Sequence, residues 1–524
     1  MPVFLKLLLI TLSFKVNVDT TIIQLEDSTT VLCATGEKYA LTQNKVNAWE
    51  YYWNHPLPAA LYLTELNSGK KLKIAENPKG LVIHASLSPS EKYVSWYDTY
   101  LKSICIYNIA SSSILILQKN IQCLPQWFPD DSAFIVYDQY DIWKIIPGRN
   151  MHINLTNGYG RKHKIIFRQL TDSILVAFNT INKQNGFFKL TENDPKLLSM
   201  DDCLYYFPIY PLDEFKPVKS IDSTTWLLLK QDAGIPPSYY STSDFKTFYP
   251  IDSFKPPTLL KSTIIRFKHI TGILYTPLTF DSSKKYPLII TYYQNFSNNL
   301  HKFQPLQNSE GTLNIPTYIS SGYMVFVPDI KTKKGHPGPS TARIVARSAK
   351  QLRKYKWIDQ KHIGLQGFSF GGYITNYVIT HSRIFAAAQE SAGPVDFISG
   401  YGSVKKGSNT SLQPLYERGQ NNMWTTPWDN PRKYLLNSPI IKVQHITTPL
   451  LILHNENDII VPYAQSMELF MAMRRLDKQV WWIQYKDEGH QLFKRENQED
   501  FSRKQLEFFN HFLKGAPPPS WMAK

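Results

Sequence analysis

Apolar and polar residues follow two different patterns along the chain, and the change comes near Thr263. Before this point, short apolar runs alternate with polar turns, and few stretches have helical spacing. After it, apolar runs of strand length are separated by stretches in which apolar residues recur every three or four positions. A period of two is typical of strands, and a period near 3.6 is typical of helices. The pattern therefore predicts an all-β domain over residues 1–260 and an α/β domain over residues 261–524.

A repeat of about 40 residues runs through the first part of the chain. Residues 88–98 match residues 128–138, and each copy is a polar turn that leads into an alternating apolar strand and ends in Tyr-Asp. Residues 61–66 resemble residues 104–109, and a turn containing Ser or Gly follows each. Short strands repeated at this period predict the blades of a β-propeller. A plain antiparallel sandwich is the alternative that the sequence leaves open.

The second part alternates strands and helices up to its end. Apolar strands are expected at residues 286–293 and 323–327, and a helix at residues 341–356. Such alternation predicts a mostly parallel, doubly wound sheet with helices on both faces. The remaining expected strands are 363–367, 385–389, 449–454 and 480–485, and the remaining expected helices are 373–381, 463–476 and 500–513.

The strongest chemical motif lies between an expected strand and an expected helix. Residues 367–371 read Gly-Phe-Ser-Phe-Gly, and another glycine follows. In this context G-x-S-x-G predicts a sharp strand-to-helix turn that lifts a serine hydroxyl above the sheet of an α/β-hydrolase fold. Glycines suit such a turn because a Cβ atom would collide with the neighbouring backbone. We therefore expect Ser369 to be a nucleophile and the backbone N–H of Phe370 to be one donor to an oxyanion.

A serine nucleophile needs a base and an acid that orients the base. Asp458 follows the expected strand 449–454, and His490 follows the expected strand 480–485. The order Ser, Asp, His and the loop positions are those of an α/β-hydrolase. Taken singly, Asp458 could cap a turn and His490 could be an ordinary histidine. The neighbouring Asp487 and Glu488 are read as a solvated pair.

Composition narrows the classes of function. The chain has 524 residues and a formal net charge of +16, but its basic residues are scattered and no nucleic-acid motif accompanies them. We expect no nucleic-acid binding, and we place the densest basic group, at residues 353–356, on a surface helix. No apolar run is long enough for a transmembrane helix.

The N-terminus and the cysteines leave alternatives open. The apolar run at residues 7–14 is either a signal peptide, which would make the protein periplasmic or secreted, or a buried strand of a cytoplasmic protein. The spacing of the four cysteines does not fit a metal site, and they form either one disulfide or buried thiols: Cys33, Cys105, Cys123 and Cys203.

Together these motifs resemble the prolyl oligopeptidase clan, and within it the dipeptidyl-peptidase-like branch of bacterial peptidases. The resemblance covers nearly all of residues 263–514. The stretches that carry it are 285–293, 328–330 with 335–338, the turn at 367–371, 454–462 (HNENDIIVP) and 488–490.

The resemblance implies a serine-type peptidase that acts on peptides through an acyl-enzyme and needs no metal or organic cofactor. It also implies that the Tyr293 hydroxyl is the second oxyanion donor and that the N-terminal domain is a β-propeller. The pocket for the residue before the cleaved bond would be formed by Phe370, Val395, Ile398, Tyr401 and Val461. An esterase or acylaminoacyl hydrolase, and a non-catalytic protein that binds through its propeller, are the alternatives. Neither the cleavage preference nor the oligomeric state follows from the sequence.

The chain also departs from this clan. Seven or eight blades of about 40 residues would exceed the roughly 260 residues available, so we expect a truncated propeller or a fragment. Dipeptidyl peptidases hold the substrate amine with paired glutamates, and no Glu-Glu pair occurs here. Ile460 stands where they place an amide side chain, two residues after the acid, and Phe368 stands where the clan usually has Trp or His. Release of dipeptides is therefore in question.

Overall fold

The chain forms two compact units, which are described separately. The structure is a computed structural model, and it describes residues 17–18, 21–22, 30–44, 59–77, 82–98, 101–117, 121, 123–206, 215–251, 260–408 and 410–523. The first unit comprises residues 1–230 and 239–252, and the second comprises residues 231–238 and 253–524. The apolar run at residues 7–14 lies outside the described residues.

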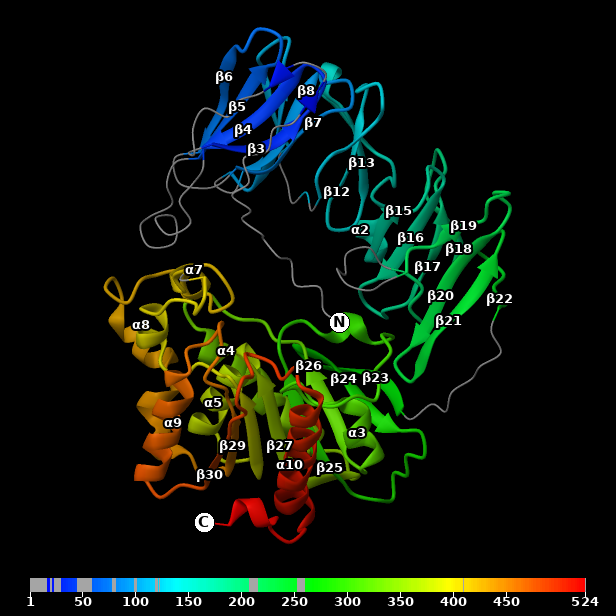
Figure 1. Cartoon of the computed structure of the whole chain (residues 1–524). Helices are drawn as coiled ribbons and strands as arrows, with labels where there is room; N and C mark the ends of the chain where they lie inside the picture. Colours follow the sequence, from blue (N-terminus) through cyan, green and yellow to red (C-terminus); the bar gives the residue numbers. More distant parts are fainter. Residues whose placement is uncertain are drawn as a thin grey trace. The chain divides into compact units, whose positions relative to one another are not determined.

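The described part of the first unit contains five four-stranded sheets that follow one another along the chain (Figure 1). In each sheet the strands lie in sequence order. A two-stranded pair, β1 (Asn17–Val18) and β2 (Thr21–Ile22), precedes them. The five sheets are β3 (Thr30–Thr35), β4 (Tyr39–Asn44), β5 (Ala59–Glu65) and β6 (Lys71–Asn77); β7 (Val82–Leu87), β8 (Tyr93–Asp98), β9 (Ser103–Asn108) and β10 (Ile114–Leu117); β11 (Gln126–Trp127), β12 (Phe134–Tyr137), β13 (Ile142–Ile146) and β14 (Met151–Asn154); β15 (Ile165–Gln169), β16 (Ile174–Asn179), β17 (Asn185–Lys189) and β18 (Lys196–Asp201); and β19 (Val218–Lys219), β20 (Trp226–Asp232), β21 (Ile235–Thr242) and β22 (Tyr249–Pro250).

The sequence repeat marks equivalent strands of successive sheets. The copies that end in Tyr-Asp contain β8 and β12, and each is the second strand of its sheet. The other repeated element corresponds to β5 and β9, and each is the third strand. Separate four-stranded sheets in a row are what propeller blades predict, whereas a sandwich would have placed these strands in two facing sheets.

Apolar side chains join each sheet of the first unit to the next. Leu41 and Val94 pack in one cluster between the first two sheets, and Ile106 and Val136 pack in one between the second and third. Two further clusters join the third sheet to the fourth and the fourth to the fifth. In the part of the chain that the structure describes, no such cluster joins the fifth sheet to the first.

Two acidic residues at equivalent turns also link neighbouring sheets. Glu91 and Asp131 have positive φ angles of 53° and 60° and lie in the turns that precede β8 and β12. The Glu91 carboxylate accepts hydrogen bonds from the backbone N–H groups of residues 37–39 in the preceding sheet. The Asp131 carboxylate accepts the Ser88 hydroxyl at 2.6 Å and the backbone N–H of Ser90 at 3.1 Å, again in the preceding sheet. An acidic side chain at the same turn position thus recurs with the repeat.

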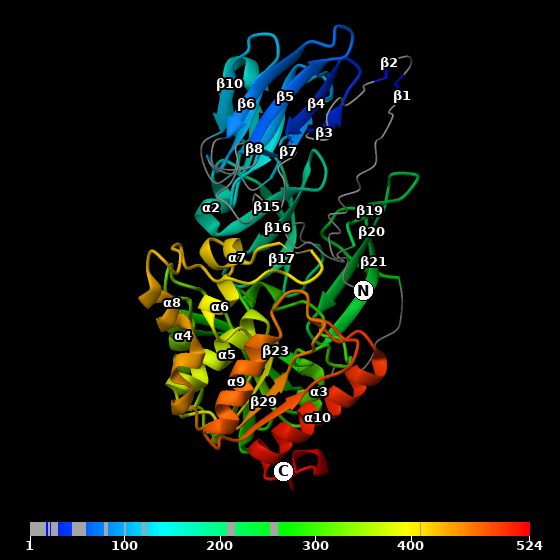
Figure 2. The same cartoon turned by 60° about the vertical axis from the view of Figure 1, so that its left-hand side comes forward.

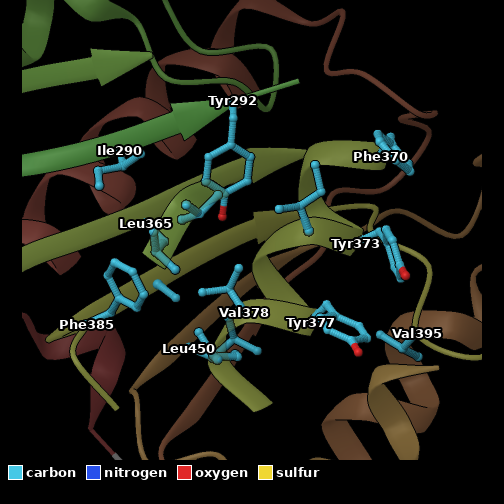
Figure 3. Close-up of a cluster of buried hydrophobic side chains, with 14 of the residues drawn as sticks. Ile290, Tyr292, Leu365, Phe370, Tyr373, Tyr377, Val378, Phe385, Val395 and Leu450 are labelled. Atoms are coloured by element: carbon cyan, nitrogen blue, oxygen red, sulfur yellow. The ribbon is translucent and has the colours of Figure 1, made fainter. Parts of the chain in front are cut away.

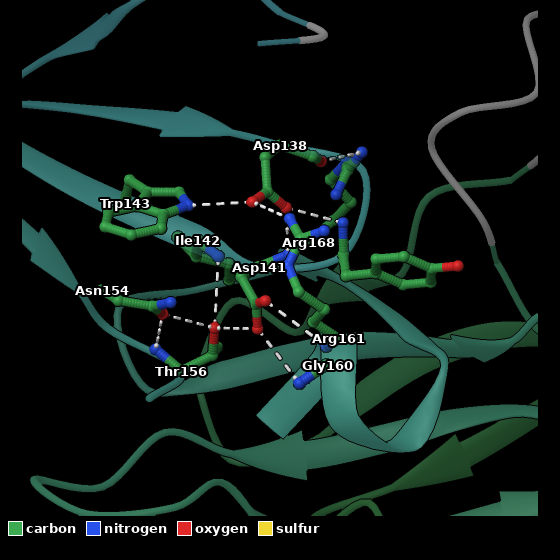
Figure 4. A network of polar contacts seen from close by, with 10 residues as sticks. Asp138, Asp141, Ile142, Trp143, Asn154, Thr156, Gly160, Arg161 and Arg168 are labelled. Atoms are coloured by element: carbon green, nitrogen blue, oxygen red, sulfur yellow. Dashed lines mark hydrogen bonds and ion pairs between the residues drawn. The ribbon is translucent and has the colours of Figure 1, made fainter. Parts of the chain in front are cut away.

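A polar network extends from the third sheet to the segment that follows it (Figure 4). Asp138 ends the second copy of the repeat, and its carboxylate accepts the Trp143 indole N–H at 3.2 Å and the Arg161 guanidinium at 2.7 Å. Asp141 accepts the Thr156 hydroxyl at 2.8 Å. Asp138 also accepts the backbone N–H groups of the two residues that form the next turn, which explains why this repeat ends in an acidic residue.

The second unit is built on one eight-stranded sheet with the order β23-β24-β26-β25-β27-β28-β29-β30. The pairings from β26 to β30 are parallel, and β23 and β24 form an antiparallel edge. The sheet is therefore mostly parallel, as the sequence predicts. Its strands are β23 (Leu260–Phe267), β24 (Ile270–Pro277), β25 (Tyr286–Tyr292), β26 (Met324–Pro328), β27 (Ile358–Phe368), β28 (Ala387–Ser391), β29 (Leu450–Leu453) and β30 (Val480–Ile483).

Helices cover both faces of this sheet (Figures 1 and 2). Adjacent strand residues point to opposite faces, so Ile290 and Phe326 belong to one core cluster whereas Ile289 and Val325 belong to the other. The first cluster includes side chains of α4 (Pro337–Leu352), α5 (Phe370–His381) and α9 (Ala464–Arg475), and Figure 3 shows its centre. The second includes side chains of α3 (Ile315–Ser320) and α10 (Arg495–Lys514). The prediction of a doubly wound sheet is confirmed.

Shorter helices lie elsewhere in the described part. They are α2 (Tyr159–His163) in the first unit and α6 (Phe397–Tyr401), α7 (Gln413–Glu417) and α8 (Pro431–Asn437) in the second, together with the 3-10 helices η1 (Pro147–Arg149), η2 (Ser297–Asn299), η3 (Pro439–His445) and η4 (Ser520–Met522).

The structure differs from the sequence analysis at the end of one helix, and it decides the state of the cysteines. The prediction that Arg353, Lys354 and Lys356 lie on a helix is wrong, because α4 ends at Leu352 and they form the turn before β27. No disulfide joins the four cysteines, all of which lie in the described part. Within the described residues, no helix has the length and apolar character needed to cross a membrane.

Glu390 is a fully buried acid near the end of β28. Its Oε2 accepts the backbone N–H of Gly393 at 2.7 Å, and its Oε1 has no hydrogen-bond partner within the described residues. Burial raises the pKa of this carboxyl group to about 8, although the Gly393 N–H and the side chains of Asn376 and Ser466 oppose the rise. At neutral pH the group is therefore mainly a carboxylic acid.

We expect Asp131→Ala to lower the free energy of unfolding of the first unit by about 1–3 kcal/mol, because it leaves the donors of the turn at Ser88 and Ser90 unsatisfied. Asp172 lies in the corresponding turn of the next sheet and is exposed, so Asp172→Ala is the matched control and should change stability by less than about 0.5 kcal/mol. Urea denaturation of both variants measures the difference. Equal effects would show that the link between sheets is not stabilising.

We expect Glu390→Gln to gain stability relative to the wild type as the pH rises from about 5 to about 8. The folded-state pKa of Glu390 is raised above its ordinary value of 4.5 to about 8, so between these values the folded protein binds more protons than the unfolded chain. Rising pH therefore lowers the free energy of unfolding of the wild type, and a glutamine at position 390 removes this pH dependence. Denaturation midpoints at pH 5, 6.5 and 8 measure the effect, and a constant difference across this range would contradict it.

Candidate active site

Ser369 lies on a tight turn between β27 and α5. Its backbone has φ 56° and ψ −116°, a conformation that L-amino acids rarely adopt. A Cβ atom on Gly367 would lie 2.1 Å from the carbonyl oxygen of Gly371, and one on Gly371 would lie 2.5 Å from that of Tyr292. Glycine is therefore required at both positions by close backbone approach. The Ser369 N–H donates to the Ser391 carbonyl at 2.7 Å, which ties the turn to β28.

Two candidate oxyanion donors lie beside this turn. Phe370 is the first residue of α5, where helix geometry leaves a backbone N–H without an intrahelical acceptor. Tyr293 directly follows β25, and its side chain is 39% exposed. Its ring carbon Cδ2 lies 3.9 Å from the Cβ position of Gly371. The Tyr293 ring is therefore next to the first turn of α5.

Asp458 lies in the loop after β29, and its side chain is completely buried. Its Oδ1 accepts the backbone N–H groups of Ile460 at 2.7 Å and Val461 at 2.9 Å. Its Oδ2 contacts His490 Nδ1 at 2.6 Å and His454 Nε2 at 3.1 Å. Burial opposes ionisation, but the hydrogen bonds from the two histidines outweigh it and hold the pKa of Asp458 well below its usual range. This residue is therefore a carboxylate.

His490 lies in the loop after β30 and keeps its ring partly accessible, with the side chain 15% exposed. The ring packs against that of Phe368, the residue before Ser369, with centroids 4.8 Å apart. Asn455 holds this loop to the loop of Asp458, because its amide donates to the Gly489 carbonyl at 2.9 Å and accepts the Tyr485 N–H at 2.9 Å. Among the described side chains, no hydrogen bond joins the Ser369 hydroxyl to His490.

The structure corrects the interpretation of Glu488. It was expected to be solvated with Asp487, but it is 1% exposed. Its carboxylate accepts the backbone N–H groups of Phe493 at 2.7 Å and Lys494 at 2.9 Å and the Asn497 amide at 2.7 Å. Glu488 thus fixes the segment that leads from His490 into α10, and only Asp487 is exposed.

Sequence reasoning also missed His454 and Asn455. Both are buried, and both contact the loops that carry Asp458 and His490. From the sequence alone, His454 is expected to be the last residue of an apolar strand, and Asn455 is expected to be a loop residue. The only signal in the sequence is that polar residues follow a buried strand at the carboxyl edge of a parallel sheet, where functional residues gather.

The residues expected to line a substrate pocket differ in exposure. Phe370, Val395 and Tyr401 are buried in the same apolar cluster, and Val461 is also buried. Ile398 is exposed. The Tyr401 hydroxyl donates to the Glu417 carboxylate at 2.7 Å, so its polar end is satisfied within the protein.

The arrangement can support acyl transfer. A serine on a strained turn, a histidine bonded to a buried carboxylate, and donors at a helix N-terminus are the components that such chemistry needs. In the described part of the chain, no cluster of three or more His, Cys, Asp or Glu side chains has the geometry to hold a metal ion.

Known proteins show similar sequences. Residues 314–516 match the sequence pattern of the prolyl oligopeptidase family. An uncharacterized peptidase of Bacillus subtilis, YuxL, is 25% identical over 233 residues, which are 43% of this chain and 34% of that protein. Dipeptidyl-peptidase 5 of Porphyromonas gingivalis is 24% identical over 494 residues, which are 87% of this chain and 62% of that protein. The chain thus spans less than two-thirds of the length of either relative.

Solved structures show a similar fold. A putative dipeptidyl aminopeptidase IV from Bacteroides ovatus aligns with a TM-score of 0.64 at 14% identity, over 94% of this chain and 80% of that one. Dipeptidyl peptidase 4 from Porphyromonas gingivalis aligns with a TM-score of 0.62 at 13% identity, over 93% of this chain and 77% of that one. Both likenesses support an N-terminal β domain followed by an α/β-hydrolase domain. Residues 314–516 of this chain are therefore a domain of the prolyl oligopeptidase family.

Proposed function

We propose that this protein is a serine peptidase whose catalytic residues are Ser369, Asp458 and His490. The observation that carries the proposal is the 2.6 Å contact between the buried Asp458 carboxylate and His490 Nδ1. Ser369 lies directly after the parallel strand β27, and Asp458 and His490 lie in the loops that follow the parallel strands β29 and β30. The carboxyl ends of parallel strands meet at one edge of the sheet, which is where the catalytic residues of such folds lie.

The reaction begins when the Ser369 hydroxyl attacks the carbonyl carbon of a peptide bond. His490 Nε2 accepts the serine proton, and the ring becomes an imidazolium whose Nδ1–H remains bonded to Asp458. His490 then donates this proton to the leaving amine, and an acyl-enzyme remains on Ser369. Water attacks the acyl-enzyme with His490 again as base, which releases the acid product and restores the serine.

Negative charge on the substrate oxygen is stabilised by the Phe370 N–H and the Tyr293 hydroxyl. A helix N-terminus favours such charge, and Tyr293 is exposed enough to reach a substrate. Asp458 stays ionised throughout because its pKa is held low, so its charge stabilises the imidazolium in both halves of the reaction. Free enzymes frequently have long contacts between the serine and the base, and these shorten when substrate binds.

Peptides are the proposed substrates, with the side chain before the cleaved bond held near Val395, Ile398, Tyr401 and Val461. Two relatives are described as dipeptidyl peptidases. Release of dipeptides is not part of this proposal, because no Glu-Glu pair occurs in the chain and Ile460 has no side-chain amide. A peptide-library digest read by mass spectrometry, together with matched amide and ester substrates, measures the bond type and the cleavage preference.

A fluorophosphonate probe should label the wild type on one residue, and Ser369→Ala should remove the label completely. The probe reacts only with a serine activated by a base. Ser382→Ala, at the opposite end of α5, is the control and should label like the wild type. Labelling is quantified by intact-protein mass spectrometry. Labelled Ser369→Ala protein would rule out this residue as the nucleophile.

Asp458→Asn should lower kcat/KM by about 10³–10⁴-fold at pH 7, because an amide in this position favours the wrong tautomer of His490. The matched control is Asp359→Asn, which removes the charge from another Asp-His pair, the 2.8 Å contact between Asp359 and His362 near the start of β27. That variant should keep kcat/KM within about twofold. Hydrolysis of a substrate identified in the library digest provides the rates, and equal losses in the two variants would contradict the role of Asp458.

A further inference from the structure

Asp458 is bonded to two histidines, and the proposed reaction uses only one of them. His454 directly follows β29, and its Nε2 lies 3.1 Å from Asp458 Oδ2, the oxygen that also contacts His490. The side chains of His454 and Asp458 are both inaccessible to solvent. A buried histidine on the acid of a catalytic pair can act on the base only through that acid.

The surroundings of His454 determine which nitrogen carries its proton. Nε2 faces two acceptors, the Asp458 carboxylate and the Val461 carbonyl at 3.3 Å, so it must be protonated. Nδ1 lies 2.7 Å from the Ser466 hydroxyl, which can donate to it. Both ring nitrogens are thus satisfied by a neutral ring with its proton on Nε2.

Ser466 links this ring to the buried acid described above. Its hydroxyl adjoins the Glu390 carboxyl group, which also neighbours Asn376. Glu390 Oε1 and the amide of Asn376 have no hydrogen-bond partner within the described residues. A polar group of β28 therefore neighbours the hydroxyl that orients the His454 ring.

We propose that His454 is a positioning residue for the Asp458–His490 pair, a neutral ring that donates from Nε2 to Asp458 and accepts the Ser466 hydroxyl at Nδ1. This inference rests on the proposed function. The neutral ring fixes Asp458 Oδ2 where His490 meets it. Because His454 carries no net charge, the full negative charge of Asp458 remains available to stabilise the imidazolium of His490.

Other titratable and charged groups face His454 from each element around it. Ser466 of α9 contacts the ring, Glu390 of β28 adjoins Ser466, and the Tyr463 ring packs edge-on with its centroid 5.8 Å from that of His454. Asp458 and His490 approach from the loops after β29 and β30. Glu456 lies on the same loop as Asp458 and is exposed, and Glu488 is held by its own three donors. Asp458 is therefore the acid that contacts His454 directly.

Two amide substitutions at His454 distinguish a positioning role of this residue from a purely structural role. In His454→Gln the side-chain amide reaches the position of Nε2 and can still donate to Asp458, whereas in His454→Asn it reaches only the position of Nδ1. The measured quantity is the rate constant for labelling of Ser369 by the fluorophosphonate probe between pH 5 and pH 9. The midpoint of its rising limb reports the ionisation of His490.

The Asn variant should move this midpoint up by about half a pH unit or more, because an acid that has lost a donor stabilises the imidazolium more strongly. Its rate at high pH should fall about tenfold, because the acid is no longer fixed. The Gln variant should keep the wild-type midpoint and most of the rate. His362→Gln alters another His-Asp pair, near the start of β27, and should leave both unchanged. Equal midpoints in the wild type and both His454 variants would overturn the proposal.

A measurement on the wild type decides the question even if the Asn variant does not fold. Side-chain nitrogen NMR of protein with labelled histidines should show a neutral His454 with its proton on Nε2 from pH 6 to pH 7.5, assigned by its loss in His454→Gln. A cationic His454, or a proton on Nδ1 alone, would overturn the proposal. A wild type that the probe does not label would instead refute the proposed function, and the NMR result would still decide the state of His454.

Discussion

The site depends on a single buried negative charge. The Asp458 side chain is inaccessible to solvent, so its charge is tolerated only if the protein supplies donors in place of water. Two backbone N–H groups and two histidines do so. These donors come from the loop after β29, from the end of β29 and from the loop after β30. The requirement to satisfy one carboxylate therefore fixes the relative positions of two loops that are about 30 residues apart in the chain.

The turn at Ser369 imposes a second constraint, and both constraints meet at the same edge of the sheet. Close backbone approach excludes side chains at Gly367 and Gly371, and a further glycine, Gly393, packs within 2.4 Å, measured from its Cβ position, of the backbone of Gly372. Glu390 bonds to the N–H of this glycine. Ser369 is thus held by backbone packing, whereas Asp458 and His490 are held by hydrogen bonds.

Much of the second unit could be predicted from the sequence because its signals are local. The G-x-S-x-G turn, the apolar strands and the order of Ser369, Asp458 and His490 each depend on neighbouring residues. Glu488 was misread because its donors lie up to nine residues further along and come together only in the folded loop. The end of α4 was misplaced because helical spacing continues into the basic turn at residues 353–356. His454 could not be recognised, since its role depends on contacts with α9 and β28 that no sequence period encodes.

The first unit shows what a repeat can and cannot reveal. The 40-residue spacing identified equivalent strands in successive sheets, because each repeat carries its own turn and its own alternating strand. It did not reveal that Glu91 and Asp131 reach back to the preceding sheet, since the two side chains differ in length.

The turns of Glu91 and Asp131 bear on how a domain of this kind can gain or lose whole sheets. The second and third sheets are each attached to the preceding sheet by a carboxylate from their own first turn, and apolar clusters join each described sheet to the next. Inserting or deleting a whole repeat would therefore renew the same kind of junction and would demand no new type of contact. The junctions between neighbouring sheets therefore set no limit of their own on how many sheets can follow one another.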